Sequence, residues 1–135
     1  KHWVKKLKIK NRNIIFLLVI LIIIHFIARF LGLYNGKVWI DIPQHILGGI
    51  FFAIIWLRII QHQKIPKPIG FMSIITFSVF GSFIWETFEL IFWMLFPNYA
   101  LSLKWFSPTV SDTISDLLAG SFGGIIVALL SHKND

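Results

Sequence analysis

The sequence contains no cysteine, and only 14% of its 135 residues carry a charge. The absence of cysteine excludes disulfide bonds and thiolate chemistry. An average soluble domain has about 25% charged residues. The low charge, together with 56% hydrophobic and 16% aromatic residues, excludes a disordered chain and argues strongly against a water-soluble globular domain. The length is sufficient for a single compact domain.

The few charges that are present are unevenly distributed along the chain. The formal net charge is +7, but residues 1–13 contain six basic residues and no acidic one. The remaining part is nearly neutral, so the basic balance indicates a cationic tail rather than a nucleic-acid-binding surface, and no nucleic-acid partner is expected. The basic residues of this tail are Lys1, Lys5, Lys6, Lys8, Lys10 and Arg12.

Four long apolar stretches follow the tail. A membrane-spanning helix needs about 20 apolar residues, and such stretches lie at about 14–33, 43–61, 69–96 and 112–130. The sequence therefore predicts an all-α fold, a polytopic bundle of four transmembrane helices at 14–130 whose partner is the lipid bilayer, with short tails at 1–13 and 131–135. The third stretch is long enough to be tilted or to extend past the bilayer.

Capping and turn signals mark the expected ends of these helices. Asn13 is a candidate N-cap of the first helix, and Tyr34-Asn35-Gly36 is a turn signal after it. Pro43 suits the first helical position of the second span. The segment 97–108 is expected to be a linker between the third and fourth spans.

The distribution of lysine and arginine predicts the orientation. The tail at 1–13 and the loop between the second and third spans are basic, whereas the two connections on the other side carry few lysines. By the positive-inside rule, both termini are expected to be cytoplasmic.

The ionisable residues inside the spans gather in the half of the bilayer that this orientation makes the outer half. They occur as pairs three or four residues apart, so each pair lies on one face of its helix. Because ionised groups facing lipid are costly, these faces should turn toward one another. The pairs are His25 and Arg29, Asp41 and His45, Glu86 and Glu89, and Asp112 and Asp116.

Several of these residues also have a structural interpretation. Asp41 is a candidate N-cap of the second helix, as are Ser111 or Asp112 for the fourth. Arg29 is a candidate counter-ion, or an interface residue whose charged end reaches the head groups. His25 is a candidate interior histidine whose ring nitrogens are hydrogen-bonded. Two acidic residues within one apolar span, Glu86 and Glu89, have no ordinary structural need and favour a function, as does Asp116.

Small residues predict which helix faces pack closely. Gly48-Gly49 and the Gly120-x-x-x-Gly124 motif permit close backbone approach. Gly120 and Gly124 continue the Asp112 and Asp116 row at four-residue steps, which predicts that these acids lie inside the bundle. The same motif is compatible with a homo-oligomer.

Three motifs together resemble those of a bacterial family. Asp41-x-x-x-His45-x-x-Gly48-Gly49, Trp85-Glu86-x-x-Glu89 and Asp112-Thr113-x-x-Asp116-x-x-x-Gly120 resemble, in this order, the signatures of the YjdF-like inner-membrane proteins. That family is related in pattern to the VanZ-like proteins. The resemblance covers about residues 38–130 and implies a multi-pass protein of the bacterial cytoplasmic membrane, and the association of VanZ with glycopeptide resistance points to the cell envelope.

Three functions remain open alongside a purely structural network that fixes helix register. The carboxylates and imidazole suit a divalent metal ion, so the cluster is predicted to bind a cation or a polar envelope ligand. A bound metal would also support a hydrolase or transferase acting on an outer-leaflet lipid or envelope precursor. A proton- or ion-coupled transporter is the third alternative. The candidate metal ligands are Asp41, His45, Glu86, Glu89, Asp112 and Asp116; the candidate catalytic residues are Glu86, Glu89, Asp116 and His45; Arg29 and His25 are candidate ligand or counter-ion residues.

Overall fold

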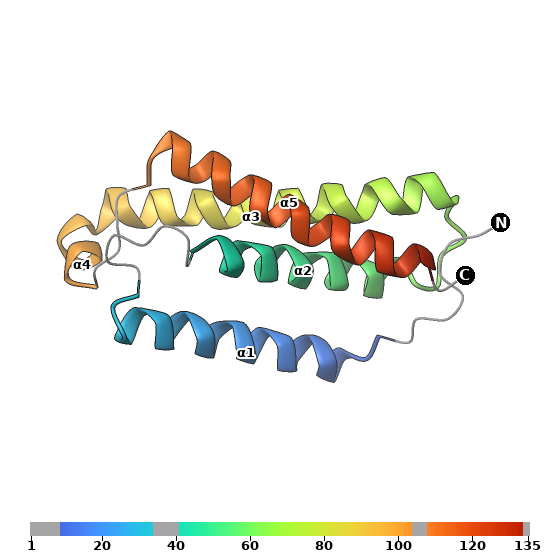
Figure 1. Ribbon diagram of the computed structural model, residues 1–135, viewed down its shortest axis with the longest axis horizontal. Helices are drawn as coiled ribbons and strands as arrows, with labels where there is room; N and C mark the ends of the chain where they lie inside the picture. Colours follow the sequence, from blue (N-terminus) through green and yellow to red (C-terminus); the bar gives the residue numbers. More distant parts are fainter. Residues whose placement is uncertain (1–8, 34–40, 104–107, 134–135) are drawn as a thin grey trace.

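A computed structural model describes residues 9–33, 41–103 and 108–133. These segments form helices and connecting turns, with no strand among them (Figure 1). The tails at 1–8 and 134–135 and the turn signal at 34–36 lie outside the described residues. The helices are α1 (Asn11–Phe30), α2 (Asp41–Ile60), α3 (Lys67–Leu95), α4 (Pro97–Ser102) and α5 (Val110–Lys133).

Four of these helices are long and apolar enough to cross a bilayer, which confirms the predicted fold class. α1 and α2 each contain 20 residues, α3 contains 29, and the apolar part of α5 contains 22. At 1.5 Å per residue, a helix of 20 residues spans about 30 Å, the thickness of the hydrocarbon core. Large apolar side chains cover the outside of the bundle, as a lipid environment requires.

The first helix begins and ends at residues other than the expected ones. α1 starts at Asn11, so Asn13 lies inside the helix and is not its N-cap. Its C-terminus is fixed by Gly32, whose φ of 64° is a conformation that glycine adopts at little cost. The N–H of Gly32 donates to the Arg29 carbonyl and that of Leu33 to the Ala28 carbonyl, the two hydrogen bonds of a Schellman motif.

The predicted linker before the last span contains a short helix of its own. α4 begins at Pro97, directly after α3, because proline suits a first helical position. The cap of α5 is also not the expected one. The N–H of Asp112 donates to the Thr109 hydroxyl at 3.2 Å, so Thr109 fills the capping role that was predicted for Ser111 or Asp112.

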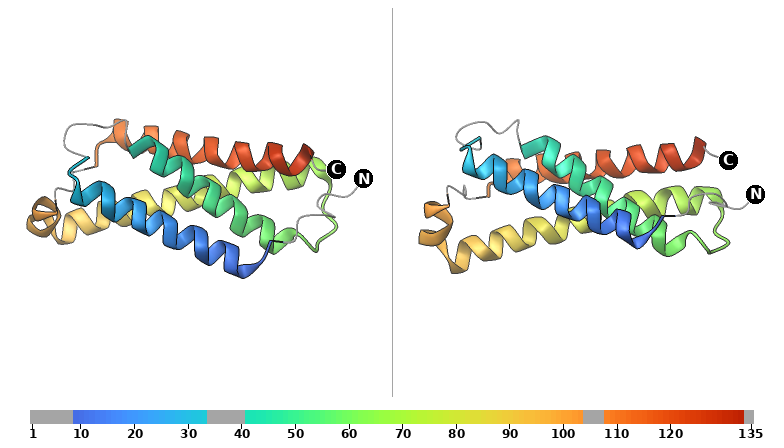
Figure 2. Two further views of the ribbon diagram at one scale, coloured as in Figure 1. Left: turned by 60° about the horizontal axis from the view of Figure 1, so that its bottom comes forward. Right: turned by 90° about the horizontal axis from the view of Figure 1, so that it is seen from below.

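The bundle consists of a three-helix core and one peripheral helix. α2, α3 and α5 all pack closely against one another, whereas α1 packs mainly against α2 and touches α3 through the rings of His25 and Trp85. Figure 1 shows α1 below α2 at the edge of the bundle, and both views of Figure 2 show the two helices side by side. α1 begins and α5 ends at one end of the bundle, and α4 lies at the other, which we call the α4 end (Figure 1).

Three rows of buried residues form the contact between the core helices. Each row advances in four-residue steps, and each has an ionisable residue near the α4 end, followed by small residues and then apolar ones. The direction of α3 is opposite to that of α2 and α5, so its row reads in reverse sequence order. The rows are His45-Gly49-Ala53-Leu57 on α2, Glu86-Ser82-Ser78-Ile74 on α3 and Asp116-Gly120-Gly124-Ala128 on α5.

The small residues bring the three backbones into close contact at mid-bundle. A methyl group added to Gly49 would collide with the Gly120 backbone, and one added to Gly120 would collide with the Ser82 hydroxyl. The Ser78 hydroxyl lies 2.8 Å from the carbonyl oxygen of Gly49 and 2.9 Å from that of Gly120. This arrangement fixes the relative height of the helices and thereby brings the ionisable ends of the three rows together.

Candidate functional site

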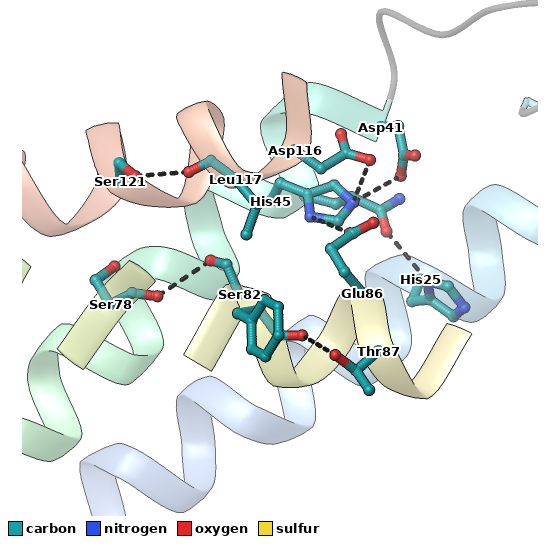
Figure 3. Close-up of polar contacts among 12 residues, drawn as sticks. His25, Asp41, His45, Ser78, Ser82, Glu86, Thr87, Asp116, Leu117 and Ser121 are labelled. Carbon is teal, nitrogen blue, oxygen red and sulfur yellow. Dashed lines mark hydrogen bonds and ion pairs between the residues drawn. The ribbon is translucent and has the colours of Figure 1, made fainter. Parts of the chain in front are cut away.

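The imidazole of His45 is the centre of a cluster of three carboxylates. Its Nε2 atom lies 3.6 Å from Asp41 Oδ1 and 3.5 Å from Asp116 Oδ2. Its Nδ1 atom lies 3.7 Å from Glu86 Oε1. Figure 3 shows the ring between the two aspartates on one side and Glu86 on the other. The cluster therefore joins all three core helices.

The separations on the Nε2 side match those of ligands around one cation. Asp41, His45 and Asp116 each offer one ligand atom, and the three atoms lie within 4.8 Å of one another. Two ligands of a tetrahedral site with bonds of about 2.1 Å lie about 3.4 Å apart. The observed distances of 3.5 and 3.6 Å from Nε2 to the carboxylate oxygens are close to that value.

Glu86 contacts the opposite nitrogen of the same ring. The residue is 5% exposed, and neither carboxylate oxygen has a hydrogen-bond partner among the described residues. A histidine that ligates a metal through one nitrogen usually donates its other N–H to a carboxylate or carbonyl. Glu86 is in the position of such a carboxylate, with its Oε1 directed at Nδ1 of His45 (Figure 3).

The cluster carries more negative than positive charge. Three carboxylates surround one imidazole, so even a protonated His45 would leave two negative charges uncompensated within the cluster if all three acids were ionised. Asp116 is 2% and His45 8% exposed. Uncompensated charge buried at this depth is costly. A divalent cation would neutralise that excess.

The remaining predicted acids lie near this cluster but outside the group of three ligand atoms. Asp112 is half-buried in the first turn of α5, one turn before Asp116. Glu89 is half-buried on α3, three residues after Glu86. Among the described residues, the group within 4.8 Å comprises Asp41, His45 and Asp116 and neither of these two.

His25 and Arg29 form a polar network on the inner side of α1. The Nδ1 atom of His25 lies 3.1 Å from Gln44 Oε1, and Arg29 Nε donates to His25 Nε2 at 3.1 Å. Because the second contact requires an unprotonated Nε2 and the first an Nδ1–H, His25 is a neutral histidine with its proton on Nδ1. Arg29 also donates to the Leu103 carbonyl at 3.2 Å.

Three polar residues that support the site were not among the predicted ones. Gln44 connects α2 to His25, and Ser78 and Ser82 lie in the buried row that ends at Glu86. The four-residue spacing of Ser78, Ser82 and Glu86 is visible in the sequence and could have identified the two serines. No local pattern indicates that Gln44 faces α1.

The fold and the cluster define a class: a polytopic helical membrane protein with a buried carboxylate–imidazole site that connects three transmembrane helices. A comparison with protein families agrees with this class. Residues 3–134 match the family described as predicted membrane protein DUF2238, and the chain belongs to that family. The membership is consistent with the YjdF-like resemblance.

Further comparisons add no relatives. No curated protein matches the chain, and no solved structure matches it. The relation in pattern to VanZ-like proteins therefore depends on the sequence motifs alone. Function has to be argued from the geometry of the cluster.

Proposed function

We propose that this protein binds one divalent cation at the α4 end of its bundle. Asp41 Oδ1, His45 Nε2 and Asp116 Oδ2 are the ligand atoms, and Glu86 orients His45 through Nδ1. The observation that carries the proposal is the convergence of these three atoms within 4.8 Å, from residues on two helices, with Glu86 buried on the far side of the ring.

The donor set favours a borderline metal ion. Mg²⁺ and Ca²⁺ prefer sites composed of oxygen atoms, whereas an imidazole nitrogen with carboxylates suits Mn²⁺, Fe²⁺ or Zn²⁺. The two aspartates and one histidine neutralise the charge of such an ion. We therefore expect Mn²⁺ or Zn²⁺ to bind more tightly than Mg²⁺.

The environment of the site supports access from one end of the bundle only. The side chain of Asp41 is 28% exposed, which provides a route to the ligands from the α4 end. In the other half of the bundle the described core is aliphatic, with Leu57, Ile60, Ile74 and Val127 among its members. This packing argues against a continuous polar path and hence against transport. Under the proposed topology, the site faces outward from the cytoplasmic membrane.

Metal analysis of the purified protein tests the proposal. The detergent-solubilised chain, stripped with a chelator, is dialysed against Mn²⁺, Zn²⁺ or Mg²⁺, and bound metal is measured by mass spectrometry. We expect one Mn²⁺ or Zn²⁺ per chain, and no stoichiometric binding by the Asp116→Asn variant. Glu89→Gln is the matched control, since it removes a carboxylate outside the three-ligand group, and it should retain the ion.

Two results would contradict this assignment. A wild-type chain that binds no metal would identify the cluster as a structural network. An equal loss of bound metal in Glu89→Gln and Asp116→Asn would show that general negative charge, and not the three-ligand geometry, attracts the ion.

The number of ligands favours one further candidate function. Three protein ligands leave coordination positions open, as in catalytic metal sites. The ion would polarise a phosphoryl oxygen of a substrate, and Asp41 would lie at the entrance. We propose a metal-dependent hydrolase or transferase acting on a lipid-linked envelope precursor as this second function. Metal-dependent phosphate release from a lipid-linked diphosphate, abolished by Asp116→Asn, would support it, and identical rates with and without metal would exclude it.

A further inference from the structure

A hollow with a mixed polar and apolar lining lies at the end of the bundle opposite the cation site. It has a volume of about 440 Å³ and is located where the segment before α1 meets the C-terminus of α2. Its lining combines cationic, amide and apolar side chains. The lining residues are Ile9, Lys10, Asn11, Arg58, Gln61 and His62.

Two hydrogen bonds hold the hollow in shape. The backbone N–H of Ile9 donates to Gln61 Oε1 at 3.2 Å, and Arg58 Nε donates to Asn11 Oδ1 at 3.1 Å. The second bond uses one N–H of the guanidinium and leaves its two terminal NH₂ groups for another acceptor. Ile9 packs against the apolar core of the bundle. The Arg58 head group is therefore positioned before any ligand arrives.

Neither Lys10 nor Arg58 forms an ion pair with a carboxylate within the described part of the chain. The described carboxylates belong to the beginning of α2, the second half of α3 and the first turns of α5, all toward the α4 end. Lys10 and Arg58 both line the hollow. The described residues that line the hollow thus carry a net positive charge and include no acidic side chain.

The hollow lies at the depth of the lipid head groups. Arg58 is two residues before the end of α2, a helix of 20 residues that spans about 30 Å of hydrocarbon. Its guanidinium therefore lies at the boundary between the acyl chains and the head groups. Arginine binds phosphate through two parallel N–H···O bonds.

From this combination we propose that the hollow binds the phosphate of an anionic phospholipid in the leaflet at the end where α1 begins. Arg58 contacts the phosphate oxygens through its terminal NH₂ groups, and Lys10 adds a second cation. Ile9 and the adjoining helices contact the first methylenes of the acyl chains. The lipid then joins the segment before α1 to α2, the helix against which α1 mainly packs.

Competition between lipids tests this site. The detergent-solubilised chain is mixed with equal amounts of phosphatidylglycerol and phosphatidylcholine of identical acyl chains, and bound lipid is measured by native mass spectrometry. We expect the wild type to retain phosphatidylglycerol preferentially. A direct hydrogen bond between a cationic side chain and a phosphate contributes about a tenfold gain in affinity or more, so Arg58→Gln and Lys10→Gln should each lose about that factor.

The matched control is Lys64→Gln, which removes an exposed cation from the same end of the bundle but outside the hollow. It should leave the preference unchanged. Arg58→Lys keeps the charge and loses the paired N–H geometry, so it should bind with intermediate affinity. If Arg58→Gln does not fold, as judged by helix content and elution volume, Lys10→Gln and Arg58→Lys still test the proposal.

Three outcomes would overturn the assignment. Equal retention of the two lipids by the wild type would show that no anionic head group is selected. An equal effect of Lys64→Gln would indicate diffuse attraction to the whole surface. Displacement of the lipid by inorganic phosphate at equimolar concentration would identify a soluble phosphate, and not a lipid, as the ligand.

Discussion

Nδ1 of His45 on α2 lies 3.7 Å from Oε1 of Glu86 on α3, and both side chains are buried. The separation is longer than a hydrogen bond, and neither oxygen of Glu86 has a hydrogen-bond partner among the described residues. This contact positions the ring so that Nε2 faces Asp41 and Asp116. Orientation of His45 by Glu86 and ligation by the two aspartates are therefore separable by mutation.

Replacement of Glu86 by glutamine should weaken metal binding without abolishing it. The amide keeps the size of the side chain but removes the charge that stabilises the Nδ1–H. Loss of such an outer carboxylate typically costs about 10- to 100-fold in metal affinity. Isothermal titration with Mn²⁺ or Zn²⁺ should show this loss with a stoichiometry of one. Unchanged affinity would remove Glu86 from the site.

Metal affinity should fall as the pH is lowered. The cation competes with protons for His45, Asp41 and Asp116, which bind metal only when deprotonated. Affinity is therefore greatest at alkaline pH and falls as these groups take up protons toward acidic pH. Equilibrium dialysis from alkaline to acidic pH measures the effect, and a pH-independent affinity would contradict ligation by His45.

Two adjacent glycines on α2 should respond in opposite ways to alanine. A methyl group at Gly49 meets the Gly120 backbone, whereas nothing lies within 4 Å of one at Gly48. Gly49→Ala should therefore lower the free energy of unfolding by about 1–3 kcal/mol through overpacking. Gly48→Ala should be neutral or stabilising by up to about 1 kcal/mol, because alanine favours the helix.

The comparison between these glycine variants is made by unfolding in mixed micelles followed by circular dichroism. Similar stabilities of the two variants would show that the backbones of α2 and α5 do not pack as closely at Gly49 as the structure indicates.

Ser78 should stabilise the junction of the three core helices. Its hydroxyl contacts carbonyl oxygens on α2 and α5, and hydrogen bonds between membrane helices contribute about 0.6 kcal/mol on average. Ser78→Ala should lower the free energy of unfolding by about that amount or somewhat more. Ser121→Ala is the control, because its hydroxyl donates to Leu117 of its own helix. Equal effects in the two variants would contradict the interhelical role.

His25 and Gln44 should be energetically coupled. Their hydrogen bond joins α1 to α2, the helix against which α1 mainly packs. A double-mutant cycle with His25→Ala and Gln44→Ala should give a coupling free energy of about 0.6 kcal/mol. Additive effects of the two substitutions on unfolding would show that this bond does not hold α1 in place.

Many residues of the candidate site could be predicted from the sequence. Spacings of three and four residues placed Asp41 with His45, and Glu86 with Glu89, on common helix faces, and the cost of charge in lipid predicted that those faces turn inward. The predicted burial of Asp116 is confirmed, since it is 2% exposed. The helix ends at Asn13 and Ser111 were predicted less well, because several residues near each end can cap and only the local backbone decides among them.

The sequence by itself determined the membrane environment, the number of spans and the helix faces that carry charge, because apolar length and helical period are local properties. Only the tertiary structure decided that His45 has Asp41 and Asp116 at one nitrogen and Glu86 at the other. That outcome depends on the relative height of three helices. The contacts of Gly49, Gly120 and Ser78 set this height, and they arise between segments distant in the chain.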